Sequence, residues 1–191
     1  WSNGKFPEFT EPSAGYHGLK YYEVLGASSF IAKVRIEGLR DLGASLSPFN
    51  AFQIIQGLET LAIRIKKHSE NALELAKWLQ KQSEVAWVNY PGLTSSKYYD
   101  LAQQYLPEGQ SGVVTFGLKS GFEGAKKVAD GTKLFALVAN IGDTKSLIIH
   151  PASTTHSQLN EEELLDQGIK PNTIRLSIGT ENVDDIIEDL E

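Results

Sequence analysis

Arg175 is the residue whose type and position best suit binding chemistry. It lies in the apolar segment 173–178, where the period-2 alternation of a strand places Arg175 and Ser177 opposite Ile174 and Leu176. A guanidinium group is a planar fork that can hold a carboxylate through two hydrogen bonds, as an amino-acid ligand requires. On this residue alone, a structural ion pair or a solvated strand face remains the favoured interpretation.

The segment 146–156 is the second candidate, because it places several hydroxyl groups after a short apolar run. Hydroxyls near a carboxylate-binding arginine can donate further hydrogen bonds to the same ligand. The chain has no G-x-S-x-G motif, which argues against a serine hydrolase. His150 and His156 are six residues apart across a proline, which is not the spacing of helical metal ligands, so no metal site is predicted. Turn-forming polar residues are the default explanation for most of this segment.

Two lysines invite a further hypothesis, because Lys133 and Lys145 each follow a threonine, and a lysine can form a Schiff base with a carbonyl compound. Nothing else near either residue supports that chemistry. The glycines between residues 109 and 124 do not match G-x-G-x-x-G or a Walker motif, so they are better explained as turns.

The composition excludes several classes of protein. The net charge is -6, and no basic cluster is present, so nucleic acid is not an expected partner. No apolar run approaches the roughly 20 residues that a bilayer crossing needs, so no membrane association is expected. The absence of Cys excludes disulfides and thiolate metal sites. The absence of Met predicts that Trp1 is not a translation start and that the chain is a fragment.

Helices dominate the first part of the chain. Apolar residues at mixed three and four spacings predict a helix over 19–42, interrupted by Gly26 and Gly38. Ser47 and Pro48 are a good N-cap and first residue for a long amphipathic helix that continues to about residue 82 and bends near Gly57. Such a helix is longer than a compact domain needs, which predicts that it serves another domain or a subunit interface.

Strands and helices alternate after residue 83. The sequence predicts strands at 84–89, 111–119 and 134–140, with helices at about 95–106 and 122–131 between them. A last strand at 173–178 precedes a helix at 183–190, which Asn182 caps. This order predicts an α/β layer structure, a small sheet with helices on one face.

Five segments of the chain carry a resemblance to a known family, and they are residues 5–21, 39–64, 71–79, 140–163 and 174–190. They resemble the Cys/Met-metabolism family of pyridoxal-phosphate (PLP) enzymes, and within it the O-acetylhomoserine sulfhydrylase branch. The resemblance implies a fold-type-I enzyme, with residues 1–60 as the tail of the large PLP-binding domain and the start of a connecting helix, and 61–191 as the C-terminal domain that closes over the substrate.

The same resemblance implies roles for individual residues. Arg175, in the sequence RLSIG, would bind the substrate α-carboxylate with help from Ser146. Cystathionine-handling members of the family commonly carry Glu immediately before the residue that matches Ser146, whereas this chain has Lys145, which argues against a cystathionine enzyme. The family's Schiff-base lysine lies in a Ser-x-Thr-Lys context that is absent here, so we expect no catalytic or cofactor-binding residue in this chain.

The resemblance therefore implies part of a PLP-dependent transferase that makes homocysteine and acetate from O-acetyl-L-homoserine and sulfide. Its upstream half would supply the cofactor site, and the family's habit implies a cytoplasmic homotetramer. The open alternatives are a methionine γ-lyase-like enzyme, an enzyme that uses O-succinylhomoserine, and a non-catalytic association module when the chain is isolated.

Overall fold

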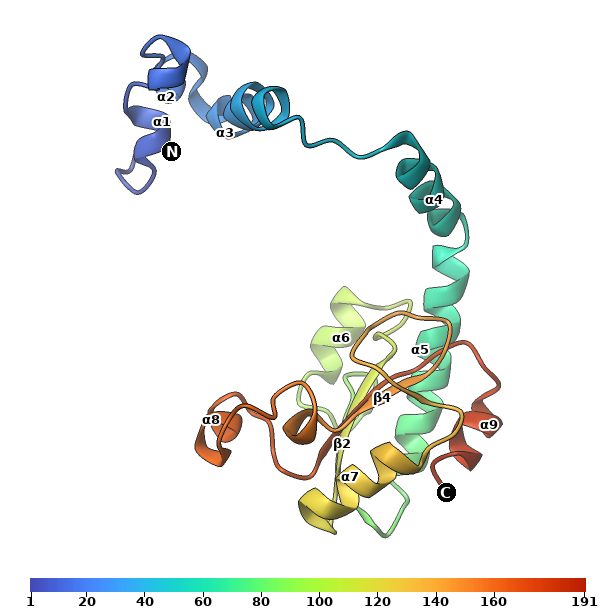
Figure 1. Cartoon of the computed structure of the whole chain (residues 1–191). Helices are drawn as coiled ribbons and strands as arrows, with labels where there is room; N and C mark the ends of the chain where they lie inside the picture. The colour runs from blue at the N-terminus through green and yellow to red at the C-terminus, as the bar shows by residue number, and fades with distance from the viewer. The chain divides into compact units, whose positions relative to one another are not determined.

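A five-stranded sheet lies at the centre of residues 57–191 in the computed structural model, which describes residues 1–191 (Figure 1). All neighbouring strands are antiparallel except β3 and β4, which are parallel. The predicted α/β fold class is confirmed. In sheet order, the strands are β1 (Val85–Asn89), β2 (Val113–Leu118), β5 (Thr173–Ser177), β4 (Leu147–Ile149) and β3 (Ala136–Leu137).

Three helices cover one face of this sheet, as predicted. They are α5 (Leu61–Leu79), α7 (Gly121–Gly131) and α9 (Val183–Glu188). Their buried residues form one core with alternate residues of the strands, and burying each large apolar side chain stabilises the fold by roughly 1.5–3 kcal/mol. The strand residues on this face are Val114, Phe116, Leu118, Ile148, Ile174, Leu176 and Ile178.

The remaining short elements of this part of the chain are α6 (Tyr99–Tyr105), the 3-10 helix η4 (Pro151–Ser153) and α8 (Glu161–Asp166). Helix α8 was not expected, because the acidic residues at 161–163 show no apolar periodicity. The helix begins with a capping box. The Asn160 side-chain oxygen accepts from the Glu163 backbone N–H, and the Glu163 carboxylate accepts from the Asn160 backbone N–H.

Strand β3 is much shorter than the strand predicted over 134–140. The backbone N–H groups of Lys133, Leu134 and Phe135 all donate to the carboxylate of Asp189, at distances from 2.8 to 3.1 Å. Because a side chain takes these donors, only Ala136 and Leu137 pair with β4. The prediction was wrong in length because it could not include a contact made more than fifty residues away.

The long helix predicted from Ser47 to residue 82 is two helices in the structure, α4 (Pro48–Glu59) and α5. Thr60 lies between them with φ -108° and ψ 1°, outside helical geometry. The Arg64 guanidinium bridges the break, because it donates to the Gly57 carbonyl at 2.7 Å and to the Thr60 hydroxyl at 3.3 Å. The predicted cap at Ser47 is confirmed by its hydroxyl, which accepts from the Asn50 amide.

Residues 1–56 contain short helical segments instead of the single helix predicted over 19–42. Gly26 adopts φ 51° and ψ -123° and ends the helix Tyr21–Leu25, and the segment Val34–Leu42 is a π-helix. A left-handed Gly43 then closes this region. The segments are α1 (Pro7–Thr10), η1 (Ala14–Tyr16), α2 (Tyr21–Leu25), η2 (Gly26–Ser28), α3 (Ser29–Lys33) and η3 (Val34–Leu42).

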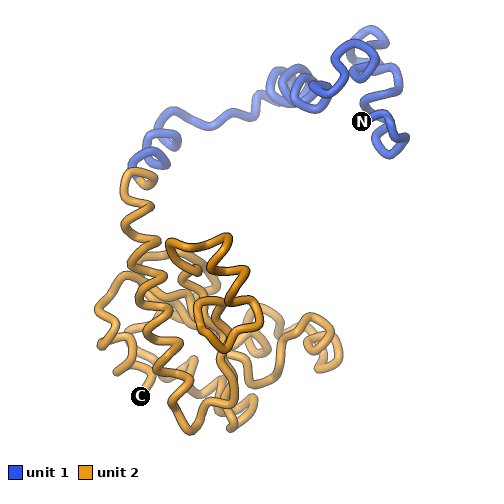
Figure 2. The backbone as a smooth tube through the Cα atoms, turned by 180° about the vertical axis from the view of Figure 1, so that it is seen from behind, with its two compact units in different colours: residues 1–56 blue, residues 57–191 orange.

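Two compact units make up the chain, residues 1–56 and 57–191, and Figure 2 colours them separately. The domain boundary predicted between residues 60 and 61 lies four residues beyond this division. None of the helices combines the length and apolar character needed to cross a membrane.

A polar cluster around Glu37 organises the first unit. The Glu37 carboxylate accepts from Lys33 Nζ at 2.7 Å, Tyr21 Oη at 2.8 Å and Ser13 Oγ at 2.9 Å. These hydrogen bonds, that from Lys33 above all, lower the pKa of Glu37. Burial, together with the hydrogen bond to Glu37, raises the pKa of Tyr21 to about 12.

The lowered pKa of Glu37 predicts a pH-dependent stability of this unit. A depressed carboxyl pKa contributes stability above the unfolded value, here near 4.5, and this contribution is lost as the pH falls through the lower folded value. Amide hydrogen-exchange protection of residues 21–42 should therefore decrease between pH 6 and pH 3, and Glu37→Gln should remove most of that pH dependence.

Glu23→Gln is the matched control for this prediction. Glu23 also pairs with a lysine, Lys20, but its side chain is 64% exposed, whereas that of Glu37 is 30% exposed. Exposed pairs contribute little to stability. If Glu23→Gln reduced the pH dependence of hydrogen-exchange protection as much as Glu37→Gln does, a dominant role for Glu37 would be contradicted.

Candidate carboxylate-binding site

Arg175 lies at the centre of β5, on the face of the sheet opposite the helices. Ile174 and Leu176 on either side of it are fully buried in the core, which confirms the predicted alternation. One guanidinium nitrogen, Nη2, donates to the Asn140 carbonyl at 2.9 Å. The other N–H groups of the fork have no partner within the chain, so the guanidinium can still accept an anionic ligand.

The sheet register places polar residues beside Arg175. Thr115 on β2 pairs with Arg175, and Asn89 on β1 pairs with Thr115, so the three form a row across the sheet. Asn89 Nδ2 donates to Thr115 Oγ1 at 3.3 Å. Ile149 on β4 continues the row on the other side of Arg175. Amide and hydroxyl groups in one row with a guanidinium can complete the hydrogen bonding of a small polar ligand.

A cavity lies over this row, and its charges are one-sided. Arg175, Lys97, Lys170 and His156 line it, and no Asp or Glu does, although the chain as a whole has a net charge of -6. Lys170 Nζ lies over the Trp87 ring, which also lines the cavity. A concave site with cations and without carboxylates favours an anionic ligand. The other lining residues are Asn89, Tyr98, Thr115, Ile149, Pro151, Thr155, Gly168, Ile169 and Thr173.

Ser146 is fully buried immediately before β4, and its hydrogen bonds are made within the chain. Its hydroxyl donates to Glu181 Oε2 at 2.9 Å and accepts from the Gly179 amide at 2.8 Å. A hydroxyl has a single hydrogen to donate. A direct hydrogen bond from Ser146 to a substrate carboxylate would therefore require the release of Glu181.

The two histidines of the segment 146–156 have different surroundings. His150 is fully buried, with Nε2 at 2.7 Å from the Pro171 carbonyl and Nδ1 at 2.8 Å from Ser153 Oγ. Because a carbonyl only accepts, Nε2 of the neutral ring carries the hydrogen, and His150 is a structural residue. His156 lines the cavity instead. No group of three or more His, Cys, Asp or Glu side chains in residues 1–191 is arranged to hold a metal ion.

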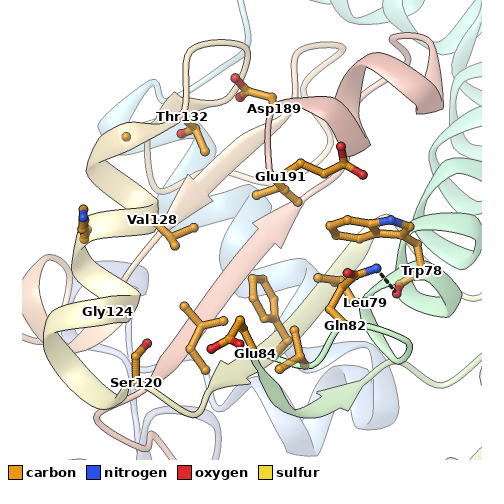
Figure 3. A pocket seen from close by; sticks show the side chains of 16 residues that line it. Trp78, Leu79, Gln82, Glu84, Ser120, Gly124, Val128, Thr132, Asp189 and Glu191 are labelled. Carbon is orange, nitrogen blue, oxygen red and sulfur yellow. Dashed lines mark hydrogen bonds between the residues drawn. The ribbon is translucent and has the colours of Figure 1, made fainter.

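A second cavity lies on the helix side of the sheet, between α5, α7 and α9 (Figure 3). Phe116, Leu118 and Val128 contribute apolar surface. Three carboxylate side chains, those of Glu84, Asp189 and Glu191, line it together with a single cation, Lys127. This charge distribution is unsuitable for a carboxylate ligand, so the cavity beside Arg175 is the better candidate.

A sequence model of the family described as "Cys/Met metabolism PLP-dependent enzyme" matches residues 19–191. The chain belongs to this family.

Relatives within the family carry consistent names. The chain is 54% identical over 200 residues to O-acetyl-L-homoserine sulfhydrylase of Leptospira meyeri, and 49% identical over 191 residues to O-acetyl-L-homoserine sulfhydrylase 1 of Thermus thermophilus. Both alignments include all of this chain but only 45% of the relative. The chain therefore spans less than half the length of the curated relatives it matches.

Solved structures agree with these relatives. The crystal structure of a putative O-acetylhomoserine (thiol)-lyase from Campylobacter jejuni matches with a TM-score of 0.85 and 52% identity, over 96% of this chain and 44% of that one. Its title records a pyridoxyl-lysine monophosphate residue in that protein. An O-acetylhomoserine sulfhydrylase from Wolinella succinogenes matches with a TM-score of 0.72 and 37% identity, over 89% of this chain and 45% of that one.

The lysines of residues 1–191 are all exposed or half-buried. A Schiff-base lysine is normally desolvated, but none of the lysines in residues 1–191 is buried. Lys133 and Lys145 are both exposed, and neither lines the cavity beside Arg175.

Sequence reasoning missed several parts of the site. Glu181 was not considered, although it lies only two residues after the RLSIG segment. Lys97 and Lys170 carry no motif, and only the folded chain brings them to the same cavity as Arg175. The Asn140 carbonyl that holds the guanidinium is a backbone group, which the sequence cannot identify.

Proposed function

We propose that this chain is the C-terminal part of a PLP-dependent enzyme that converts O-acetyl-L-homoserine and sulfide to L-homocysteine and acetate. The observation that carries the proposal is the cavity beside Arg175, which contains cations and no carboxylate. The names of the relatives support the choice of substrate. In this reaction the bond from the γ-carbon to the acetoxy oxygen breaks, acetate leaves, and a bond from sulfur to that carbon forms.

Arg175 would bind and orient the amino-acid substrate in this enzyme. Its free N–H groups would hold the α-carboxylate, and the hydrogen bond to Asn140 would keep the guanidinium from rotating. Fixing the carboxylate also fixes the α-carbon, so its proton points toward the catalytic groups of the missing half. The family's cofactor supplies an electron sink for charge that develops on the substrate carbons.

The exposed apolar surface of α4 suits packing against the missing half of the enzyme. Phe49 and Phe52 are 67% and 57% exposed, and Ile54, Ile55 and Leu58 are also exposed. A cluster of large apolar side chains exposed on one helix usually marks a surface that another part of the protein covers. We propose that residues 1–60 belong to the large PLP-binding domain, and that α4 packs against its upstream part or a neighbouring subunit of a cytoplasmic homotetramer. Residues 61–191 would form the substrate-closing domain.

An O-succinylhomoserine-using enzyme is the second candidate, and the cavity offers an observation in its favour. Lys97 and Lys170 lie in the same cavity as Arg175, and a succinyl ester carries a second carboxylate that they could bind. The Lys at position 145, where cystathionine-handling members carry Glu, argues against a cystathionine enzyme. A methionine γ-lyase-like elimination would need no sulfide at all.

An assay of the intact enzyme separates these candidates. We expect homocysteine from O-acetyl-L-homoserine only when sulfide is present. The kcat/KM should be at least tenfold above that for the succinyl ester, since a site matched to one ester rejects another by about 1.4 kcal/mol or more. A preference for the succinyl ester would support the second candidate. Rapid release of ammonia without sulfide would support the lyase.

The isolated chain offers a separate test of the proposal that it is a part. We expect no turnover from residues 1–191 alone, because the Schiff-base lysine would lie in the missing half. The absorbance of a bound pyridoxal group, together with homocysteine formation by this chain alone, would contradict the proposal. An inactive chain that associates with the separately expressed upstream half and regains activity would support it strongly.

A further inference from the structure

We propose that Glu181 is a positioning residue for Arg175, because its carboxylate fastens the loop 140–146 along β5. The inference rests on the proposed function, since it assigns Glu181 a part in holding the arginine that would bind substrate. Nothing in the sequence resemblance gives Glu181 a role. The evidence for the proposal is a series of hydrogen bonds spaced along the loop 140–146, from Glu181 at one end to the Arg175 guanidinium at the other.

The Glu181 carboxylate holds Ser146 by two hydrogen bonds. Oε1 accepts from the Ser146 amide at 2.6 Å, and Oε2 accepts from the Ser146 hydroxyl at 2.9 Å. The same hydroxyl accepts from the Gly179 amide at 2.8 Å. A charged acceptor makes such bonds stronger than neutral ones. Ser146 is fully buried, so water does not compete for its groups.

The loop 140–146 then follows β5 back to Arg175. The Thr180 amide donates to the Thr144 carbonyl at 2.8 Å, and the Gly142 amide donates to Ser177 Oγ at 3.2 Å. The series ends where Arg175 Nη2 donates to the Asn140 carbonyl. Glu181 therefore holds one end of the loop, at Ser146, and the other end of the loop, at Asn140, holds the Arg175 guanidinium.

The turn 178–181 is itself anchored in the core from the side of α5. His68 Nδ1 donates to the Ile178 carbonyl at 2.6 Å. Asn71 Nδ2 donates to the carbonyls of Gly179 and Glu181, at 3.1 and 2.9 Å. Both side chains are buried. Glu181 thus extends its carboxylate to the loop from a backbone that α5 holds in place.

Ser146 acquires an indirect role from this geometry. The single hydrogen of its hydroxyl goes to Glu181, so the residue links the loop to Glu181 and does not donate to substrate. The resemblance implies a direct contact between Ser146 and the carboxylate. Only the indirect role predicts that the effects of Ser146 and Glu181 variants are not additive, because both residues then act through the same contact.

Glu181→Gln in the intact enzyme tests the proposal. Glutamine keeps only one of the two acceptor oxygens, because its amide nitrogen only donates, so the paired hydrogen bonds to the Ser146 amide and hydroxyl cannot both keep their geometry. The loop should therefore loosen, and the guanidinium should lose its fixed orientation. We expect KM for O-acetyl-L-homoserine to rise roughly tenfold with kcat changed less than about threefold, as loss of binding common to ground and transition states predicts. Amide exchange of residues 140–146 should become faster, and Glu188→Gln, on the exposed side of α9, should change neither quantity.

The dependence on Arg175 distinguishes positioning from a general structural effect. In an Arg175→Ala background, Glu181→Gln should lower kcat/KM less than about twofold, because the residue it positions is gone. An equal loss in both backgrounds, or unchanged exchange of residues 140–146, would overturn the proposal. If Arg175→Ala alone has no effect, the proposed function fails, and the exchange measurement still decides whether Glu181 holds the loop.

Ser146→Ala provides the second variant should Glu181→Gln not fold. It breaks one link between Glu181 and the loop from the other side, so it should raise KM to a similar extent. The double variant, where it folds, should be no worse than the more impaired single variant. Losses that multiply would assign Ser146 a separate, direct contact with the substrate and would contradict the indirect role.

Discussion

Arg175→Ala is expected to lower kcat/KM for O-acetyl-L-homoserine by about 100- to 1000-fold in the intact enzyme. The variant removes a bidentate, charge-assisted pair with the substrate carboxylate, which corresponds to roughly 3–4 kcal/mol. Arg175→Lys should recover only a small part of the loss, because an ammonium group lacks the planar fork. Steady-state kinetics of the purified variants measures both effects.

The control for this prediction removes a positive charge from the other side of the sheet. Lys126 is exposed on α7, in the helix layer, so Lys126→Ala should leave kcat/KM within about twofold of wild type. Arg175→Ala with wild-type kcat/KM would show that the substrate carboxylate is bound elsewhere. Equal losses in the two variants would point to a general effect of charge.

Gly179→Ala is expected to lower the free energy of unfolding by about 3 kcal/mol. A Cβ atom at this position would lie 2.2 Å from Glu181 Oε2, 2.4 Å from the Thr144 carbonyl oxygen and 2.6 Å from the Ser146 amide nitrogen. Two of these atoms belong to the backbone and cannot move away as a flexible side chain does. The variant must therefore separate the loop 140–146 from the turn 178–181.

Thermal unfolding of the intact enzyme measures this loss, with Gly131→Ala as the control. Gly131 ends α7, and no heavy atom lies within 4 Å of the Cβ position there. Alanine should therefore be tolerated or slightly stabilising at position 131. Equal midpoints for the Gly179→Ala and wild-type proteins would contradict the close approach at Gly179.

Local sequence signals predicted those parts of the fold that depend on local physics. Asn182 was predicted to cap the last helix, and its side chain accepts from the Asp184 amide. The alternation around Arg175 predicted which face of β5 joins the apolar core, because a one-residue shift of register would move Ile174 and Leu176 out of that core. Both signals act within a few residues, so one sequence is enough to recognise them.

Side-chain contacts that hydrophobic periodicity does not report explain two of the differences between the predicted and the observed fold. Asp189 shortened β3 by taking backbone donors from residues 133–135. Thr60 divided the long helix with the help of Arg64, a side-chain contact that periodicity does not report. Helix α8 is the exception, because the capping-box pattern from Asn160 to Glu163 was present in the sequence and was overlooked.

Only part of the candidate site could be identified from the sequence. Arg175 could be proposed from its chemistry and its strand, and the resemblance added Ser146. The partner that occupies Ser146, Glu181, lies 35 residues further along the chain. The cations that share the cavity with Arg175 come from separate loops. Only the folded structure brings these groups together.

A crystal structure of the intact enzyme with a non-reactive substrate analogue tests the central claim most directly. We predict both carboxylate oxygens of the analogue within about 2.7–3.2 Å of Arg175 nitrogens, with the Asn140 carbonyl still on Nη2. A carboxylate bound to another cation, with Arg175 facing solvent or a protein acid, would contradict the account.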